Sequence, residues 1–309
     1  MGLDAYVNTF GAVCKAKHGE RLRKLTIDAQ FTCPNRDGTL GRGGCTFCNV
    51  ASFSHQVAQE LSITEQLSQG KIRYREAKPK QNADKFIAYF QAYTSTYGEY
   101  QVLMDKYDEA VGDGDIVGLC VGTRPDCVPD EVLDLLVNYQ KKGLDVWLEL
   151  GLQTANDVTL HKINRGHDFA CYCDTVARAR GRGLKVCTHL ILGLPDETHD
   201  DVMATLTAVL KQGVDGFKLH PLHIVEGSTM AKAWRSGRLP LLTIEEYASS
   251  VGEFIRHTPK DIIFHRVTAY AKKPMLLAPD WCAYRWNGLV AIVDNLQRLG
   301  GQGDALEGR

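Results

Sequence analysis

Three cysteines lie close together in a polar, glycine-rich stretch between residues 31 and 52. Cys33, Cys45 and Cys48 have the spacing C-x11-C-x2-C, and no fourth Cys or His follows within a few residues. A structural zinc site needs four protein ligands, usually as two close pairs. A cubane iron–sulfur cluster also has four irons, so three thiolates leave one iron open to another ligand. The spacing therefore predicts a metal site that something other than protein completes.

The alternative is that these cysteines are core residues, because a free cysteine packs like a small apolar side chain. The segment is too polar and too rich in glycine for a core. Gly43 and Gly44, directly before Cys45, allow positive φ, so the loop can fold tightly around an inorganic group. We therefore interpret the stretch as a metal site.

Length and composition limit the setting of this site. A chain of 309 residues with 44% hydrophobic residues is long enough for one α/β barrel. The net charge of −1 creates no overall field for nucleic acid or membranes, so such a partner would need a local patch. We find no signal peptide and no membrane-spanning stretch. The ten cysteines are irregularly spaced, which favours a reducing cytoplasm over a disulfide framework.

The middle of the chain alternates strand-like and helix-like segments, which predicts a parallel sheet. The expected strands cover residues 24–30, 85–91, 116–122, 146–152, 185–192 and 216–221. The expected helices cover residues 64–78, 99–111, 130–142, 168–181 and 198–212. Six units fit either a doubly wound sheet or a partial barrel, and periodicity leaves both open. In both folds the functional face lies at the carboxyl ends of the strands.

The pattern is looser beyond Thr229. We expect helices at 243–257 and 286–299, a short strand at 261–267, and a disordered tail from residue 300.

Seven sequence strings, in this order, resemble one family. They are CPNRDGTLGRGGCTFCN, FQAYTSTYG, VGTRPDCVPD, WLELGLQT, INRGHD, HLILGLP and KLHPLHIV. The chain resembles the radical S-adenosylmethionine (radical SAM) superfamily, and most closely its YhcC/YtqA-type subfamily. That subfamily is similar to the radical domain of the Elongator catalytic subunit and, more distantly, to oxygen-independent coproporphyrinogen dehydrogenase.

The resemblance implies an α/β fold, a partial (β/α)6 TIM-like barrel at residues 18–229. A C-terminal α/β extension, residues 230–309, would cap the barrel. Cys33, Cys45 and Cys48 would hold a 4Fe–4S cluster whose free iron chelates S-adenosylmethionine. One electron would then cleave this cofactor to methionine and a 5′-deoxyadenosyl radical, which abstracts hydrogen from a substrate. The first cysteine gap departs from the superfamily's usual C-x3-C-x2-C, but long gaps occur in the Elongator-like branch.

The resemblance also implies the residues that bind S-adenosylmethionine. Phe47 would lie beside the adenine, and Gly193 and Leu194 belong to the loop that would pass under it. The position that takes the methionine amine corresponds to Gln91, Tyr93 and Thr94, where the family's Gly-Gly-Glu string is missing and backbone carbonyls would serve instead.

Three polar residues match further positions of the cofactor site. Glu149 and Gln153 would hold the ribose or the methionine, and Arg165 would bind the methionine carboxylate. The alternatives are a structural salt bridge for Glu149, which is a carboxylate in an apolar strand, and a solvated surface position for Arg165. The remaining cysteines, such as Cys127, are not spaced for a second cluster.

The substrate is left open. Basic runs mixed with aromatics at 15–24, 71–80 and 256–273 could hold RNA, although each is also typical of a solvated face. The Elongator resemblance favours tRNA, at the wobble uridine, and a flavodoxin- or ferredoxin-like reductant is expected. The alternatives are radical chemistry on a small metabolite such as a porphyrin precursor, an iron–sulfur sensor or electron carrier, and a zinc-stapled RNA-binding module.

Overall fold

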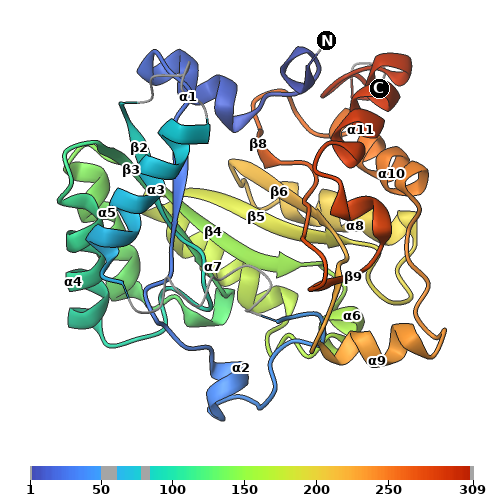
Figure 1. Ribbon diagram of the computed structural model, residues 1–309, viewed down its shortest axis with the longest axis horizontal. Coiled ribbons are helices and arrows are strands. Elements are labelled where there is room, and N and C mark those ends of the chain that lie inside the picture. Colours follow the sequence, from blue (N-terminus) through green and yellow to red (C-terminus); the bar gives the residue numbers. More distant parts are fainter. Residues whose placement is uncertain (1, 50–60, 78–83, 307–309) are drawn as a thin grey trace.

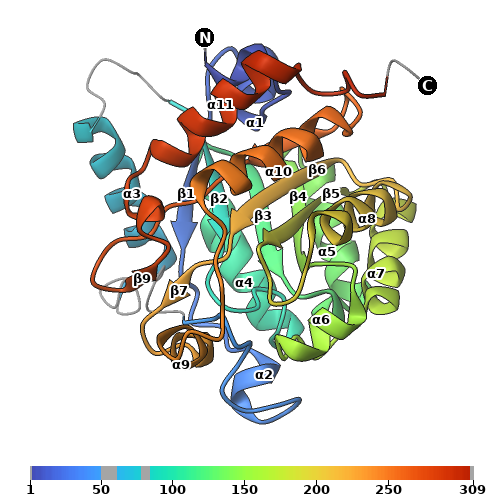
Figure 2. The same ribbon diagram turned by 90° about the vertical axis from the view of Figure 1, so that its right-hand side faces the viewer.

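The computed structural model describes residues 2–49, 61–77 and 84–306, and its central element is a curled parallel sheet (Figure 1; Figure 2). The strands lie side by side in the order β1-β2-β3-β4-β5-β6-β8. Their bounds are β1 Arg23–Ile27, β2 Phe86–Phe90, β3 Ile116–Thr123, β4 Asp145–Gln153, β5 Lys185–Leu192, β6 Gly216–Pro221 and β8 Ile263–Arg266. A doubly wound sheet reverses its order part-way, and this sheet does not. The fold is therefore the partial barrel, and the short strand expected at 261–267 is confirmed as β8, which adds a seventh strand to the sheet.

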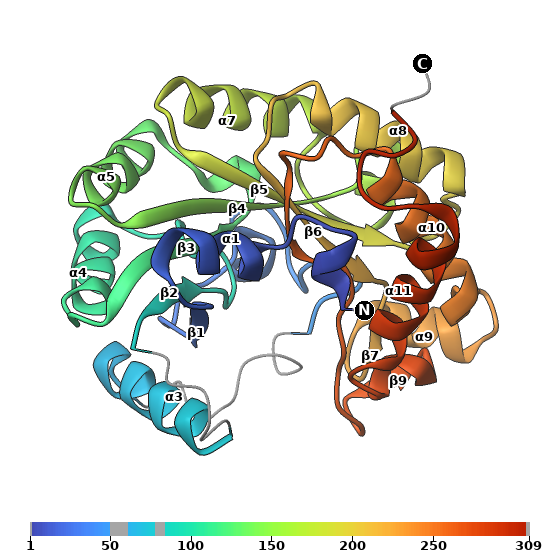
Figure 3. The same ribbon diagram turned by 90° about the horizontal axis from the view of Figure 1, so that it is seen from above.

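Helices connect consecutive strands and cover the outer face of the curl (Figure 3). They are α3 Ile63–Ala77, α4 Tyr100–Val111, α5 Asp130–Lys141, α7 Phe169–Gly181 and α8 His199–Leu210. Side chains along a strand alternate between its two faces. On β4, Leu148 and Leu150 join the large apolar core under the helices, while Trp147 belongs to a separate cluster inside the barrel. The predicted βα rhythm is confirmed, and its alternation places Glu149 inside the barrel.

Several short elements were not expected from the sequence. They are α1 Phe10–His18, α2 Pro34–Asp37, α9 Thr229–Arg235, β7 Ile224–Val225, β9 Leu276–Ala278 and the 3-10 turns Leu3–Ala5, Pro125–Cys127 and Asp280–Ala283. Helix α1 starts at Thr9, whose hydroxyl accepts a hydrogen bond from the Ala12 N–H. Its Phe10 packs against Trp147 and His265, with ring centroids 5.9 and 4.3 Å apart. The helix thus helps to fill the barrel interior.

The C-terminal region adds to the barrel as well as covering it. Its helices α10 Ile244–Arg256 and α11 Asn287–Leu299 match the expected ones, and α10 carries a capping box between Thr243 and Glu246. Strand β8 pairs with β6 in parallel, so this region supplies the last strand of the sheet. Strand β9 pairs antiparallel with β7 beside the barrel mouth. The division of the chain at residue 229 remains a prediction. In the described part of the chain, no helix has the length and apolar character needed to span a membrane.

The tail is packed where disorder was expected. Residues 300–306 fold back over the N-terminal segment, while residues 307–309 lie outside the described residues. Gln302 is 5% exposed, and its amide donates to the carbonyls of Pro259 (2.6 Å) and Ile262 (2.8 Å). Its Oε1 accepts from the Asn8 N–H at 2.8 Å. The polar, glycine-rich composition of the tail gave no sign that Gln302 would be buried, because its hydrogen-bond partners are far away in sequence.

We expect Gln302→Ala to lower the free energy of unfolding by about 2–3 kcal/mol, because it leaves a buried N–H and two carbonyls without their partner. Chemical denaturation measures this change. Gln297→Ala, at an exposed position on α11, is the control and should change stability by less than about 0.5 kcal/mol. Equal, small effects of both substitutions would contradict the packed tail.

Candidate active site

The three cysteines lie on one loop after β1. Cys33 directly precedes α2, and its carbonyl accepts from the Arg36 N–H at 2.8 Å. Cys45 and Cys48 share a tight turn in which the Cys48 N–H donates to the Cys45 carbonyl at 3.0 Å. Gly44, with φ 81°, lies so close to the Arg36 side chain that a Cβ would be 2.9 Å from its Nε. The loop is therefore shaped by glycine conformations, as its composition indicates.

The loop lines a cavity of about 270 Å³ at the carboxyl ends of the strands. Six of the predicted cofactor residues also line it: Phe47, Gln91, Tyr93, Thr94, Gln153 and Arg165. Tyr93 and Gln153 have φ of 60° and 84°. Non-glycine residues in this region carry backbone strain and are concentrated at functional sites. The structure thus brings the three cysteines and these six residues to one place.

Gly193 and Leu194 do not line the cavity. Gly193 has φ 85°, and a Cβ on it would lie 3.1 Å from the Leu242 side chain, so this turn packs against the C-terminal region. Leu194 is 2% exposed and belongs to the main apolar core. Their contact with the adenine remains a prediction.

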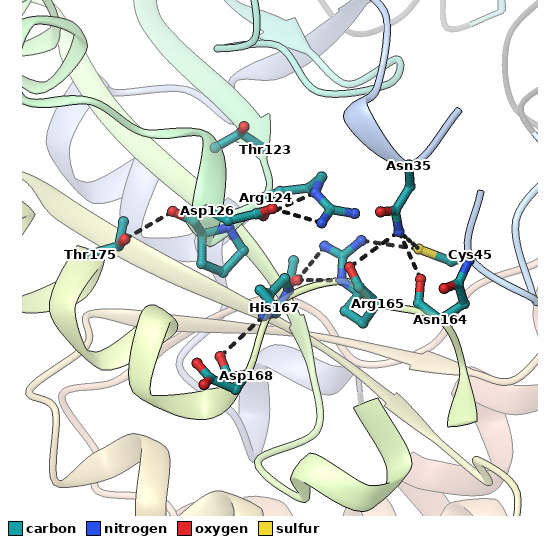
Figure 4. A network of polar contacts seen from close by, with 12 residues as sticks. Asn35, Cys45, Thr123, Arg124, Asp126, Asn164, Arg165, His167, Asp168 and Thr175 are labelled. Atoms are coloured by element: carbon teal, nitrogen blue, oxygen red, sulfur yellow. Dashed lines mark hydrogen bonds and ion pairs between the residues drawn. The ribbon is translucent and has the colours of Figure 1, made fainter. Parts of the chain in front are cut away.

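Arg165 is fixed against the cysteine loop (Figure 4). Its guanidinium donates to the Cys45 Sγ at 3.4 Å and to the Gly151 carbonyl at 3.1 Å, and the side chain is buried. Asn35 Nδ2 lies 3.7 Å from the same sulfur and donates to the Asn164 carbonyl at 2.7 Å. Arg165 is therefore not a solvated surface residue. Hydrogen bonds to sulfur tune the potential of an iron–sulfur group.

Arg124 is a second buried arginine at the cavity, which the sequence analysis missed (Figure 4). It forms a bidentate pair with Asp126, at 3.0 and 2.8 Å, and this pair raises the pKa of the guanidinium although burial opposes it. Its Nη1 is buried and has no hydrogen-bond partner among the described residues. The Arg-x-Asp spacing in the string VGTRPDC is the sequence feature from which this ion pair could have been predicted.

Glu149 lies beneath the cavity and does not line it. Its carboxylate accepts from Lys218 Nζ at 2.8 Å, contacts His189 Nε2 at 2.8 Å, and is paired with Lys24. The side chain is completely buried, and although burial itself raises its pKa, Lys218 and Lys24 hold the pKa well below the ordinary value. The salt bridge considered from the sequence is present. Contact with the ribose or methionine remains a prediction.

Histidines and cations form the wall of the cavity on β5, β6 and β8, and the sequence analysis did not single them out as site residues. This wall includes His189, Lys218, His220, His223 and Arg266. Burial lowers the pKa of His189 and His223 to about 4 and that of Lys218 to about 8. The string KLHPLHIV carries three of these residues.

The residues at the site fit an iron–sulfur cluster that also binds an organic ligand. The buried Thr94 Oγ1, Arg124 Nη1 and His223 Nε2 lack hydrogen-bond partners among the described residues, so polar groups are available to a ligand. Within residues 2–49, 61–77 and 84–306, no three His, Cys, Asp or Glu side chains are grouped to bind a single metal ion. This arrangement is compatible with a cubane, in which each thiolate binds a different iron.

Comparison with known proteins agrees with this geometry. The family model for the radical SAM superfamily matches residues 33–209, and the model for a radical SAM C-terminal domain matches residues 214–298. The chain belongs to the radical SAM superfamily. It is therefore an enzyme whose cofactors are a 4Fe–4S cluster and S-adenosylmethionine, and such enzymes need an external reductant.

Individual relatives place the chain within this superfamily. It is 56% identical to the protein YhcC of Escherichia coli, over 99% of this chain and 97% of that protein. It is 38% identical to YtqA of Bacillus subtilis, over 91% of this chain and 87% of that protein. Among solved structures, Elp3 of Methanocaldococcus infernus has a TM-score of 0.64 at 16% identity and supports the fold. That alignment covers 90% of this chain and 63% of Elp3.

We expect Gly166→Ala to prevent stable cluster loading. Gly166 has φ 74°, and a Cβ would lie 2.7 Å from Asn35 Oδ1 and 3.1 Å from Arg124 Nη2. The substitution would push apart the residues that contact Cys45. Iron and sulfide content after anaerobic reconstitution should fall to less than about half of the wild-type content.

Gly183→Ala is the matched control, since Gly183 has φ 73° and a Cβ added there would meet no atom within 4 Å. Both variants carry about 1 kcal/mol of left-handed strain, and only Gly166→Ala adds the collision. Equal iron contents in the two variants would show that this contact does not hold the loop.

We also expect the apoprotein to lose stability as the pH falls from about 6.5 to about 4. The pKa of His189 is lowered from 6.5 to about 4 by burial, so in this range the unfolded chain binds a proton that the folded protein does not. Between pH 7 and pH 5 this histidine contributes a loss of about 1–2 kcal/mol. Denaturation at both pH values should show a smaller loss for His189→Gln. The exposed His161→Gln should keep the wild-type loss, and a wild-type loss in His189→Gln would refute the assignment.

Proposed function

We propose that Cys33, Cys45 and Cys48 hold the 4Fe–4S cluster at the base of the cavity. The observation that carries this proposal is the position of all three on one loop lining the cavity, with Arg165 donating to the Cys45 sulfur. When bound, the cluster supplies the electron that cleaves S-adenosylmethionine to methionine and a 5′-deoxyadenosyl radical. The substrate would then lose a hydrogen atom to this radical.

The protein's own residues bind and shield the cofactor in this proposal. Phe47 offers an aromatic face to the adenine, and Gln153 and Thr94 offer polar groups to the ribose and methionine. Arg165, which lines the cavity, would bind the methionine carboxylate. Leu222 and Val225, from the segment after β6, line the cavity with apolar surface and exclude water from the radical.

For the substrate, we propose tRNA, at the wobble uridine. The chain is 30% identical over 125 residues to a protein named tRNA uridine(34) acetyltransferase from Dehalococcoides mccartyi, covering 40% of this chain and 26% of that protein. This match is short, and acetyl transfer is not part of the proposal. The step proposed is hydrogen abstraction from a C5 substituent of a uridine that has been flipped into the cavity.

An exposed aromatic and basic patch supports an RNA substrate. Arg285 lies over the rings of both Tyr270 and Trp286, at 5.8 and 5.4 Å from their centroids. The two aromatic residues are 41% and 62% exposed. Aromatic faces with an arginine plane stack on unpaired bases. Tyr270 follows shortly after Arg266, which lines the cavity, so the patch and the cavity belong to adjoining segments.

The second candidate is a small anionic metabolite, such as a porphyrin precursor. The cationic wall of β6 and β8 favours it, because Lys218 and Arg266 lie inside the cavity rather than on the outer surface. Both candidates use the same radical step and differ in whether RNA is required.

The decisive measurement is 5′-deoxyadenosine release by anaerobically reconstituted, reduced enzyme supplied with S-adenosylmethionine. We expect release by the wild type and none above background by Cys33→Ala. Cys14→Ala, at a buried cysteine of α1 outside the cavity, is the matched control and should retain release. A fully loaded wild-type enzyme that releases nothing would overturn the proposal in favour of a sensor or electron carrier.

Bulk tRNA in the same assay tests the substrate. We expect tRNA to stimulate release several-fold, and Trp286→Ala to lose most of this stimulation. Val290→Ala, at a neighbouring exposed apolar residue, should retain it. Release that does not respond to tRNA would favour the small metabolite.

A further inference from the structure

The interior of the barrel holds more positive than negative charge. Lys24, Lys218 and Arg266 are grouped around the carboxylate of Glu149. Lys24 and Lys218 both form ion pairs with Glu149. Arg266 has no ion pair with any of the described residues. Three cations therefore face one carboxylate, which leaves an excess of two positive charges.

The neighbouring titratable groups do not compensate this excess. Burial lowers the pKa of His220 well below its ordinary value, and it lowers that of His223 to about 4, so both rings are neutral at pH 7. Burial raises the pKa of Tyr89 and of the Cys187 thiol well above their ordinary values, so neither is an anion. A charge excess in a desolvated interior is costly unless a counter-ion is bound.

Arg266 is the cation with free hydrogen-bonding capacity. Its Nε is buried without a partner among the described residues. Arg266 nevertheless lines the cavity. The His223 ring on the same wall donates to the Ala269 carbonyl, so its buried and unpartnered Nε2 is the acceptor of the neutral ring. The donors that face this space are therefore the Arg266 guanidinium from β8 and the His220 ring from β6.

These donors are separate from the groups that contact the cysteine loop. Arg165 and Asn35 reach Cys45 from the loop after α6 (Asp157–Lys162) and from α2. A guanidinium beside a neutral imidazole is suited to an oxygen anion, because the guanidinium supplies a positive charge with several N–H donors and the imidazole supplies one more.

We propose that Arg266, with His220, binds an oxyanion of the substrate, a carboxylate or a phosphate. This inference rests on the proposed function, since it assigns the wall of β6 and β8 to the substrate and leaves the cysteine-loop side of the cavity to S-adenosylmethionine. The anion neutralises part of the buried charge excess, and it fixes one end of the substrate while the reacting C–H faces the cofactor.

Binding of simple anions to the holoenzyme tests the inference. Anaerobic, cluster-loaded protein is saturated with S-adenosylmethionine, without reductant, and titrated with inorganic phosphate or with acetate. Thermal denaturation and calorimetry measure binding, with chloride at equal ionic strength as the reference. We expect at least one of the two anions to bind and to raise Tm, and the preferred anion tells a phosphate-bearing substrate from a carboxylate-bearing one.

Arg266→Gln should weaken this binding by about tenfold or more, because it removes the charge and part of the donor fork. His220→Phe, which removes one donor at similar size, gives a second variant if Arg266→Gln does not fold. Arg298→Gln, at an exposed arginine on α11 outside the cavity, is the control and should bind as the wild type does.

Three results would overturn the inference. They are no binding of either anion by the wild type, unchanged binding by both cavity variants, and binding that occurs only in the absence of S-adenosylmethionine. The last result would assign the wall to the methionine carboxylate. The readout is independent of radical chemistry, so an enzyme that binds the anion without releasing 5′-deoxyadenosine would contradict the proposed reaction and leave this site intact.

Discussion

One buried carboxylate ties together the strands of an open barrel. Glu149 on β4 contacts Lys24 on β1, His189 on β5, Lys218 on β6 and, at 3.2 Å, His265 on β8. An incomplete barrel lacks the hydrogen bonds that would join its first and last strands, and β1 and β8 are not paired here. Contacts through a shared anion therefore connect side chains across a gap that the backbone does not close. Burial makes these contacts strong, and it makes the loss of any one partner costly.

The same interior divides into three levels along the strands. The lowest contains Phe10, Trp147 and the thiol of Cys120. The middle level contains the Glu149 group, and the highest is the cavity with the cysteine loop. Alternate residues of β4 occupy successive levels, in the order Trp147, Glu149, Gly151 and Gln153. Along this one strand, Trp147 packs in the core, Glu149 forms ion pairs, and Gln153 lines the cavity. The Glu149 carboxylate is thus kept behind the reacting region, while Lys218 and Arg266 extend to the cavity wall.

The sequence was sufficient for the parts of this architecture that repeat. The βα rhythm identified the main strands and helices, and the spacing of Cys33, Cys45 and Cys48 identified the loop that lines the cavity. It was insufficient where a residue's role depends on distant partners. His265 lies in a short strand that carries no motif, and Gln302 lies in a glycine-rich tail. The roles of both residues arise from contacts with residues at least 40 positions away in sequence. Periodicity reports which face a residue occupies and gives no information on such pairs.

The N-terminal segment also has consequences for how the chain matures. Several of its partners lie late in the sequence: Thr9 forms a parallel bridge with Phe264, whose N–H donates to the Asn8 carbonyl, and Gln302 binds both Tyr6 and Asn8. During synthesis these first residues leave the ribosome long before β8 exists. Their contacts with Phe264 and Gln302 can form only after nearly the whole polypeptide has been made. The end of the barrel opposite the cavity is therefore completed last, by the N-terminal and C-terminal segments together.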